Sequence, residues 1–407
     1  MGDERGFLKA GRSSIVYRPI CERVQDFLEV SVLPENKALQ KQASRCMDCS
    51  TPFCHWACPL GNYIPEWNDH IYRGNWRAAF ELLEETNNLP EITGRVCPGL
   101  CEYSCVLGVN DDPVNIRENE FGLSEYGLRK GFAGRKKHAD KSGRSVAVIG
   151  SGPAGLSCAA QLSRVGHKVI VFERDSLPGG ILRYGIPDFK LEKQIIDRRI
   201  RILKEQGVVF KTNMEVGVDL GVRDLVSNFD AVVLAGGSHV PRDLNIEGRG
   251  LKGIYFAMEY LTQSNRRVSG VKFAKEELID GKGKKVVIIG GGDTGSDCVG
   301  TAHRQGASCV VQIEVLPQPP LCRNDKYPWP EFPLLLKNSS SHQEGGNRYW
   351  SVITKGFKGR LGRVNKLCCV RADFSALGKN GCQAVSEVQG SDFEIEADLV
   401  IIAVGFL

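Results

Sequence analysis

The sequence contains no long apolar run and little bias of charge. No run approaches the ~18–20 apolar residues that a membrane-spanning helix needs. A net charge of +5 over 407 residues is too small to indicate nucleic-acid binding. The segment Met1–Ala10 is polar and charged, unlike a secretory signal. We therefore expect a cytoplasmic protein with no membrane or nucleic-acid partner, whose cysteines stay reduced.

Groups that carry acid–base or nucleophilic catalysis are also scarce. The chain has seven histidines, and neither a Ser/His/Asp arrangement nor a pair of neighbouring carboxylates stands out. We therefore assign no catalytic side chain. The content of 25% charged and 42% hydrophobic residues is ordinary for a globular protein. At ~150 residues per domain, the length allows two or three domains.

Cysteine, in contrast, is concentrated in one region. The patterns C-x2-C-x4-C-x3-C-P and C-P-x2-C-x3-C contain Cys46, Cys49, Cys54, Cys58, Cys97, Cys101 and Cys105. The first pattern has the same ends as the bacterial ferredoxin run C-x2-C-x2-C-x3-C-P and a longer middle. A zinc site is the main alternative, because C-x2-C is also a zinc half-site. The spacing favours iron–sulfur ligation, and a disulfide framework does not fit a reducing compartment.

The first of two glycine fingerprints follows a short apolar run at 146–149. Gly150, Gly152 and Gly155 form a G-x-G-x-x-G motif before a helical pattern. Such glycines permit a tight turn, close approach of a pyrophosphate and helix–strand packing, while the helix N-terminus binds phosphate. Glu173, 18 residues after Gly155, is placed to accept hydrogen bonds from a ribose, although a solvated acid at a strand end is the alternative. The pattern predicts a dinucleotide site.

The same arrangement recurs near residue 286. Gly290, Gly292 and Gly295 follow a second apolar run and precede a second helical pattern. Eighteen residues after Gly295 the sequence has Ile313, with Glu314 adjacent. We interpret the lack of an acid at that position, with Arg304 and Arg323 nearby in sequence, as a slight indication of a 2′-phosphate and hence NADP. The alternative interpretation is that both arginines are ordinary surface residues.

These patterns predict an α/β protein with two Rossmann-like dinucleotide-binding domains, preceded by a helical iron–sulfur domain over residues 1–140. Two further apolar runs, 231–237 and 399–405, each read as a buried strand ending in small residues. We interpret them as evidence that one domain is inserted in the other. The flavin domain then covers 141–281 and resumes at 398–407, and the NAD(P)H domain covers 282–397.

Longer strings carry a resemblance to a known family. They are Arg45–Cys49, Cys58–Asn62, Thr93–Cys97, Leu182–Lys193 (LRYGIPDFKLEK), Pro241–Leu244, Gly290–Cys298, Pro328–Pro330 and Ser340–Gly346. From end to end, the chain resembles the small (beta) subunits of glutamate synthase. The resemblance implies FAD on the first fingerprint, NADPH or sometimes NADH on the second, and two 4Fe–4S clusters.

Carried over by position, the resemblance also implies ligands. One cluster would use Cys46, Cys49, Cys54 and Cys105, and the other would use Cys58, Cys97 and Cys101 with Glu120 as a non-cysteine ligand. In the flavin domain it implies contacts from Gly180, Ile181 and Lys190. In the second fingerprint, Asp293 and Thr294 are included among the nucleotide contacts.

The family passes electrons to a large (alpha) subunit that makes glutamate from glutamine and 2-oxoglutarate. The alternative activity is that of a ferredoxin–NADP or sulfur-type oxidoreductase subunit of the same fold, and a non-enzyme alternative is a zinc-bound scaffold that senses nucleotides. Members of the family continue past the AVGF string, near which this sequence stops at Leu407. We therefore expect weak FAD retention in this chain.

Overall fold

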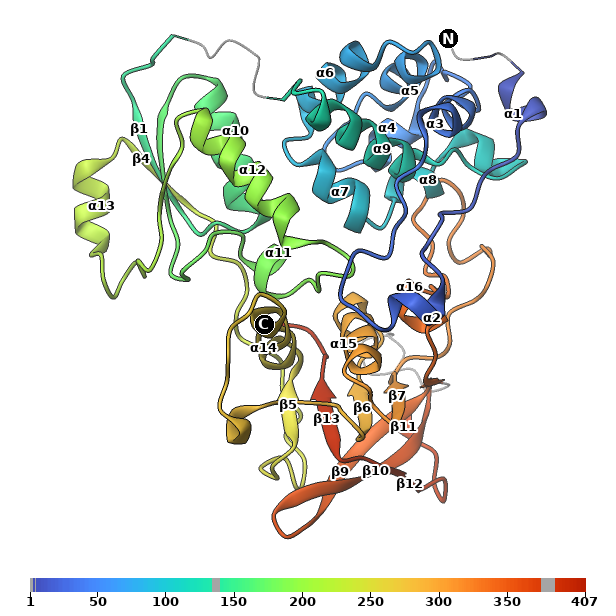
Figure 1. Ribbon diagram of the computed structural model, residues 1–407. Coiled ribbons are helices and arrows are strands. Elements are labelled where there is room, and N and C mark those ends of the chain that lie inside the picture. Colours follow the sequence, from blue (N-terminus) through green and yellow to red (C-terminus); the bar gives the residue numbers. More distant parts are fainter. Residues whose placement is uncertain (1–2, 4, 134–139, 375–384) are drawn as a thin grey trace.

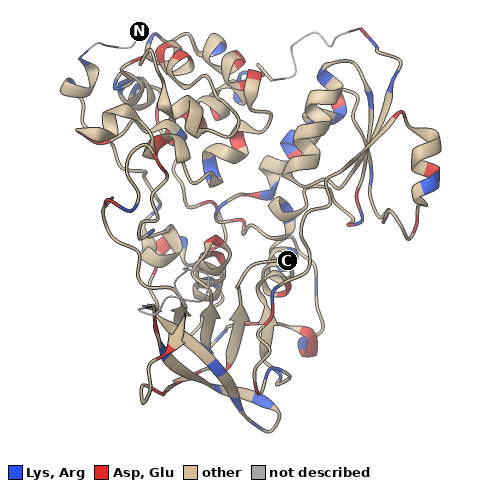
Figure 2. Ribbon diagram, turned by 180° about the vertical axis from the view of Figure 1, so that it is seen from behind, with Lys and Arg blue, Asp and Glu red and all other residues tan. Residues whose placement is uncertain are grey.

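The computed structural model describes residue 3 and residues 5–133, 140–374 and 385–407, which form three parts (Figure 1). A helical region, blue to teal, comes first in the chain. A green α/β unit follows, and a yellow-to-red α/β unit completes the molecule. In the described ranges, no helix combines the length and the apolar character that a membrane span requires. Basic and acidic residues are interspersed over the elements of all three parts (Figure 2).

Short helices, most of them around one apolar core, make up the helical region. They are α1 (Gly6–Lys9), α2 (Ile20–Arg23), α3 (Asn36–Ala43), α4 (Phe53–Ala57), α5 (Ile64–Tyr72), α6 (Trp76–Thr86), α7 (Pro90–Val96), α8 (Leu100–Tyr103), η1 (Val106–Val109) and α9 (Ile116–Arg129). In α5, Ile64, Trp67 and Ile71 lie on one face and are buried. A Cβ on Gly94 of α7 would lie 2.7 Å from the Phe121 backbone of α9, so these two helices are in close contact. The prediction of a helical N-terminal region is confirmed.

The first α/β unit is a parallel sheet in the order β3-β2-β1-β4. Its elements are β1 (Ser145–Ile149), α10 (Pro153–Arg164), β2 (Lys168–Phe172), α11 (Ile181–Tyr184), α12 (Lys193–Glu205), β3 (Val209–Lys211), α13 (Val222–Asn228) and β4 (Ala231–Leu234). Leu156 of α10 and Ile196 of α12 belong to the core that covers one face of the sheet. β4 is an edge strand, and its Leu234 is 82% exposed. This strand is therefore less buried than its apolar sequence predicts.

The second α/β unit is a parallel sheet in the order β5-β13-β6-β7-β8. Its elements are β5 (Ile254–Phe256), α14 (Ala257–Val268), η2 (Lys275–Glu277), β6 (Lys285–Ile289), α15 (Asp293–Arg304), β7 (Cys309–Ile313), α16 (Ser340–Gln343), β8 (Asn347–Tyr349) and β13 (Leu399–Ile402). A small antiparallel sheet of β9 (Val352–Arg360), β10 (Arg363–Asp373), β11 (Ser386–Glu387) and β12 (Phe393–Glu396) follows β8. Its Phe357 and Leu367 share an apolar core with Val287 of β6, so it covers one face of the parallel sheet.

The position of β13 corrects the predicted bounds of the two α/β domains. Residues 398–407 were expected to return to the flavin unit, but β13 pairs with β5 and β6 in the second sheet. β5 and α14 also belong to this second unit, which therefore begins before residue 282. Among the described residues, no strand after β4 rejoins the first sheet. The physical reason is that a four-residue apolar strand, LVII, fits the interior of either parallel sheet.

Buried ion pairs connect the three parts. Glu344, after α16, accepts hydrogen bonds from Arg23 of α2 at 2.8 Å and from Arg304 of α15 at 2.6 and 2.9 Å. The side chains of these three residues are at most 2% exposed. The Arg304 guanidinium also lies 3.9 Å from the ring centroid of Phe189 in the first unit. Because a buried charge is costly without a partner, this triad fixes the N-terminal segment against the second unit.

Candidate cofactor sites

The first fingerprint turn joins β1 to α10 and lies against the end of β4. Gly150 has a φ of +99°, and a Cβ there would lie 2.5 Å from the carbonyl oxygen of Ala235. A Cβ on Gly155 would lie 2.0 Å from the Gly150 oxygen. At Gly152, by contrast, an added Cβ has no neighbour within 4 Å. The turn is therefore closely packed on the sheet side and open at Gly152, where a pyrophosphate would approach.

Glu173 lies at the end of β2, directly beside this turn. Its Oε2 accepts a hydrogen bond of 3.0 Å from the Ser151 N–H and a second one from the Ser151 hydroxyl. Its Oε1 accepts from the Asp175 N–H at 2.9 Å. Glu173 is buried. The structure thus brings the predicted ribose-binding acid to the fingerprint, where its carboxylate is already held by backbone and hydroxyl donors.

Two of the three other residues expected in the flavin site are near the turn. A Cβ on Gly180 would lie 2.7 Å from the Gly152 Cα, and Ile181 starts α11 with 48% of its surface exposed. Lys190 has another partner, because its ammonium group forms an ion pair with Asp297 of α15. In this structure Lys190 joins the first unit to the second, so the expectation that it neutralises the flavin pyrophosphate is not supported.

The second fingerprint turn repeats the geometry of the first. Gly290 has a φ of +122°, and a Cβ there would lie 2.2 Å from the Ala403 oxygen at the end of β13. A Cβ on Gly295 would lie 2.3 Å from the Gly290 oxygen, whereas a Cβ on Gly292 would have no neighbour within 4 Å. Asp293 and Thr294 are the first two residues of α15, whose free N–H groups face this opening. The turn is suited to a second dinucleotide.

Strand register corrects the comparison of the two predicted ribose positions. Ile149 pairs with Phe172 in the first unit, and Ile289 pairs with Ile313 in the second. Glu173 follows Phe172, so its equivalent is Glu314 and not Ile313. The second unit has one more residue between the last fingerprint glycine and the end of the strand, which residue counting did not reveal. The second unit therefore has an acid, Glu314, at the position that matches Glu173.

The two arginines expected to bind a 2′-phosphate have other partners. Arg304 is held by Glu344, as described above, at the C-terminal end of α15. Arg323 donates to the carbonyl oxygens of Tyr327, Glu331 and Tyr103 at 2.9, 2.7 and 2.9 Å. The structure does not support either arginine as a phosphate ligand. No local sequence pattern indicates these partners, since Glu344 lies 40 residues from Arg304.

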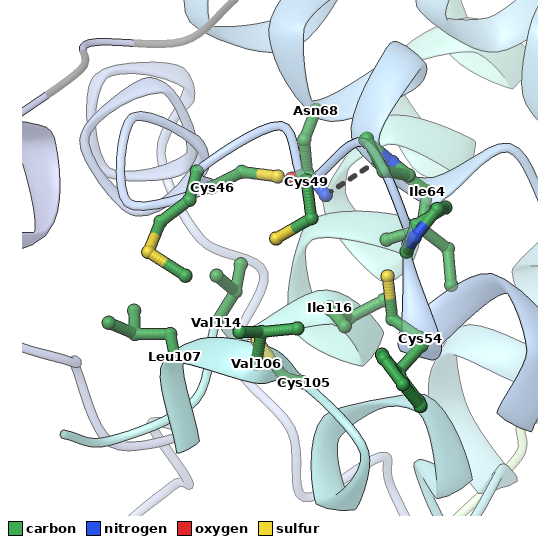
Figure 3. Close-up of a pocket in the computed structure, with 14 residues that line it drawn as sticks. Cys46, Cys49, Cys54, Ile64, Asn68, Cys105, Val106, Leu107, Val114 and Ile116 are labelled. Atoms are coloured by element: carbon green, nitrogen blue, oxygen red, sulfur yellow. Dashed lines mark hydrogen bonds between the residues drawn. The ribbon is translucent and has the colours of Figure 1, made fainter. Parts of the chain in front are cut away.

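Four cysteines of the helical region surround one apolar pocket (Figure 3). Cys46, Cys49, Cys54 and Cys105 direct their sulfur atoms toward a shared space in this view. Cys46 follows α3, Cys54 lies in α4, and Cys105 precedes η1. The rest of the pocket wall consists of Met47, Pro52, Phe53, Ile64, Pro65, Asn68, Val106, Leu107, Val114 and Ile116. The structure thus brings together the four cysteines that the resemblance assigns to one cluster.

The other three cysteines form a second group with Glu120. Cys97 ends α7, Cys101 lies in α8 and Cys58 ends α4. Burial raises the pKa of Cys97 and of Cys101, and the negative charges of Glu120 and Cys58 act in the same direction on both. The Gly99 N–H donates to the Cys97 sulfur at 3.5 Å. These side chains are therefore neighbours in space.

Both groups have the chemistry of metal donors. Burial raises the pKa of Cys46 to about 12 and also raises the pKa of Cys54. Burial raises the pKa of Glu120 to about 7, although Thr93 and Asn87 donate hydrogen bonds to its carboxylate. Thiolates at such sites require the positive charge of a bound metal. No three His, Cys, Asp or Glu side chains in the described part of the chain converge closely enough for a single metal ion.

Two family models match the chain and coincide with these parts. One, described as dihydropyrimidine dehydrogenase domain II, 4Fe-4S cluster, matches residues 23–129, which contain all seven clustered cysteines. The other, described as pyridine nucleotide-disulphide oxidoreductase, matches residues 144–325, which contain both fingerprints. The fold and the sites therefore define an NAD(P)H-dependent oxidoreductase with FAD/NAD(P)-binding domains and a 4Fe–4S domain.

Similar proteins identify the family. "Glutamate synthase [NADPH] small chain" of Mycobacterium tuberculosis is 49% identical over an alignment of 413 positions, which covers 100% of this chain and 83% of that protein. "Glutamate synthase [NADH]" of Schizosaccharomyces pombe is 43% identical over 99% of this chain and 20% of that protein. The structure of FprA, an M. tuberculosis oxidoreductase, matches 65% of this chain and 71% of its own with 20% identity and a TM-score of 0.51, which shows a shared fold. The chain belongs to the glutamate synthase small chains.

Proposed function

We propose that this chain takes hydride from NAD(P)H at the second fingerprint and delivers single electrons to a glutamate synthase large subunit that makes glutamate from glutamine and 2-oxoglutarate. FAD on the first fingerprint and two 4Fe–4S clusters would, when bound, supply the conversion of a two-electron donor into single electrons. The observation that carries the proposal is the pairing of two open fingerprint turns with two separate groups of buried thiols.

The residues proposed for each group come from the family resemblance, and the geometry above supports them. The first cluster would be held by Cys46, Cys49, Cys54 and Cys105, and the second by Cys58, Cys97, Cys101 and Glu120. Gly150, Gly152, Gly155, Glu173, Gly180 and Ile181 would contact FAD. Gly290, Gly292, Asp293, Thr294 and Gly295 would contact the pyridine nucleotide. Hydride transfer between two rings needs positioning and not a general acid or base, which fits a site with no assigned catalytic side chain.

Helix α7 supports an order for the two clusters. Leu89 and Ile92, at the start of this helix, belong to the same apolar core as Leu156 of α10 in the first unit. The Asn88 amide donates at 2.9 Å to the Ser157 hydroxyl, also in α10. At the other end of the helix, Val96, the residue before Cys97, packs against this same core. The group that contains Cys97 therefore adjoins the flavin unit, and we assign the group that contains Cys46 to the exit side.

Exposed apolar side chains beside the cysteines offer a docking surface for the large subunit. Trp56 is 70% exposed, and Leu60 and Tyr63 are 45% and 40% exposed. All three lie within or just after the first cysteine pattern, and the Trp56 ring centroid lies 5.7 Å from that of Phe53, which lines the pocket of the exit-side group. An aromatic side chain in this position is typical of a protein interface.

The test is to combine the purified chain with a large subunit, glutamine and 2-oxoglutarate and to follow NAD(P)H consumption and glutamate together. We expect the two amounts to match. Cys97→Ser should abolish glutamate formation while the flavin still reduces a small dye, because only the route through the clusters is broken. Trp56→Ala should weaken association without changing dye reduction. NAD(P)H consumption that proceeds without glutamate in the complete system contradicts the proposal.

A further inference from the structure

Glu314 occupies the same place in the second unit as Glu173 in the first. The Gly150 N–H donates to the Phe172 oxygen and the Gly290 N–H to the Ile313 oxygen, both at 2.8 Å. Each acid follows that strand residue directly. The two acids also have equivalent contacts to the next strand of each sheet. The N–H groups of Glu173 and Glu314 donate at 2.8 Å to the carbonyl oxygens of the last residues of β3 and β8. The two carboxylates thus start from matching backbone positions.

The carboxylate of Glu314 extends over the second fingerprint turn. A Cβ on Gly291 would lie 1.9 Å from its Oε2, so glycine at this position leaves the space that the carboxylate uses. The matching residue in the first unit is Ser151, which donates two hydrogen bonds to Glu173. Gly291 has no side chain to donate, and no hydrogen bond or ion pair to the Glu314 carboxylate is found among the described residues. Its oxygens are available to a ligand.

The surroundings of Glu314 offer little to a 2′-phosphate. Arg304 and Arg323 are held elsewhere, and residues 315–322 contain no lysine or arginine. Arg348 lies on the neighbouring strand β8. Burial lowers its pKa, and the negative charge of Glu314 acts in the opposite direction. Its guanidinium donates at 3.1 Å to the Lys337 oxygen and lies 4.9 Å from the Trp350 ring centroid. The positive charge of Arg348 is offset by the negative charge of Glu314. The site therefore lacks the net positive charge that a dianionic phosphate requires.

We propose that Glu314 makes the second fingerprint select NADH over NADPH, by accepting hydrogen bonds from the ribose hydroxyls of NADH and repelling the 2′-phosphate of NADPH. The inference rests on the proposed function, in which this fingerprint takes a pyridine nucleotide. It replaces the weak indication of NADP from sequence, which depended on Ile313 being the equivalent of Glu173. The names of the two relatives above differ on this point, one with NADPH and the other with NADH.

A binding experiment can isolate the 2′ position from any redox step. The oxidised, flavin-loaded chain is titrated calorimetrically with 5′-AMP and with 2′,5′-ADP, which differ only in the 2′-phosphate, and then with NAD⁺ and NADP⁺. The wild-type chain should bind 5′-AMP and NAD⁺ at least about tenfold more tightly than 2′,5′-ADP and NADP⁺. The 2′-phosphate replaces the hydrogen bonds from the ribose hydroxyls to the Glu314 carboxylate with repulsion between two negative charges.

Glu314→Gln keeps the shape of the side chain and removes its charge. We expect the preference for 5′-AMP over 2′,5′-ADP to fall by about tenfold or more in this variant. Glu387→Gln is the matched control, since Glu387 is an exposed acid of the same unit that pairs with Lys355 away from the fingerprint. This control should retain the wild-type preference.

Each other outcome rejects part of the account. Equal or tighter binding of 2′,5′-ADP by the wild type overturns the inference and leaves the proposed function intact. If Arg348→Ala then removes that binding, Arg348 is the phosphate ligand. If Glu314→Gln retains the preference for 5′-AMP, another group causes the selectivity, and the inference is again overturned. If neither NAD⁺ nor NADP⁺ binds, the proposed function fails together with it.

Discussion

Arg199 in α12 donates two hydrogen bonds of 2.6 Å to the two carboxylate oxygens of Glu91 in α7, and both side chains are buried. This bidentate pair joins the helical region to the first α/β unit. Glu91 is near the start of the helix that ends at Cys97. The pair therefore helps to fix the distance between the second group of thiols and the first fingerprint.

Removal of one partner of this pair should destabilise the protein strongly. Glu91→Gln or Arg199→Met leaves an uncompensated buried charge or polar group, and we expect a loss of about 3–5 kcal/mol in the free energy of unfolding. The double variant Glu91→Leu/Arg199→Met should recover part of that loss, because neither charge of the pair remains, although the buried Glu84, 3.8 Å from Arg199, loses a partner. Denaturant unfolding followed by circular dichroism measures these values. Single variants as stable as the wild type would show that the pair contributes little.

Each group of cysteines should lose its cluster independently of the other. Two 4Fe–4S clusters require about eight irons per chain, and Cys49→Ser or Cys97→Ser should each leave about four. The exposed Cys21, outside both groups, is the control, and Cys21→Ser should keep all of the iron. Iron and acid-labile sulfide are measured after anaerobic purification. Loss of all iron in either variant would contradict two separate sites.

Two glycines of the first fingerprint should respond differently to alanine. Gly155→Ala places a methyl group 2.0 Å from the Gly150 oxygen, so we expect a loss of several degrees in the melting temperature. Gly152→Ala has open space around the new methyl group and should leave the melting temperature of the flavin-free chain unchanged. That methyl group should still exclude the pyrophosphate and abolish flavin retention. If Gly152→Ala binds flavin normally, the pyrophosphate does not lie at this turn.

Stability should fall with pH below about 6.5 because of His342. Burial, together with Arg348 and Lys190, lowers the pKa of His342 to about 4, while Asp293 opposes the shift. The neutral ring accepts from the Ser339 N–H at 3.2 Å and donates through Nε2 to Gln312 at 2.8 Å.

Because the unfolded chain takes up this proton near pH 6.5 and the folded chain only near pH 4, stability is lost as the pH falls between these values. The loss should reach about 2 kcal/mol after allowance for partial exposure. His342→Gln should have a smaller difference between its unfolding free energies at pH 7.5 and pH 4.5 than the wild type. An identical difference in both proteins would show that His342 does not cause the pH dependence.

Local patterns in the sequence predicted most of the site. The glycine fingerprints, the cysteine spacings and the helical first region depend on short-range chemistry that one segment contains by itself. The errors concern long-range contacts. The strand at 399–402 suits either sheet, Glu314 required strand register and not residue counting, and the partner of Arg304 is a buried acid 40 residues away. None of these relationships has a local signature.

The most direct test of the account is the composition and electron uptake of the anaerobically purified chain. Iron, acid-labile sulfide and flavin are determined together, and the dithionite-reduced protein is examined by electron paramagnetic resonance. The account predicts about eight irons and about eight sulfides per chain, together with bound flavin and signals from two reduced 4Fe–4S clusters. A colourless protein that contains zinc in place of iron would contradict it.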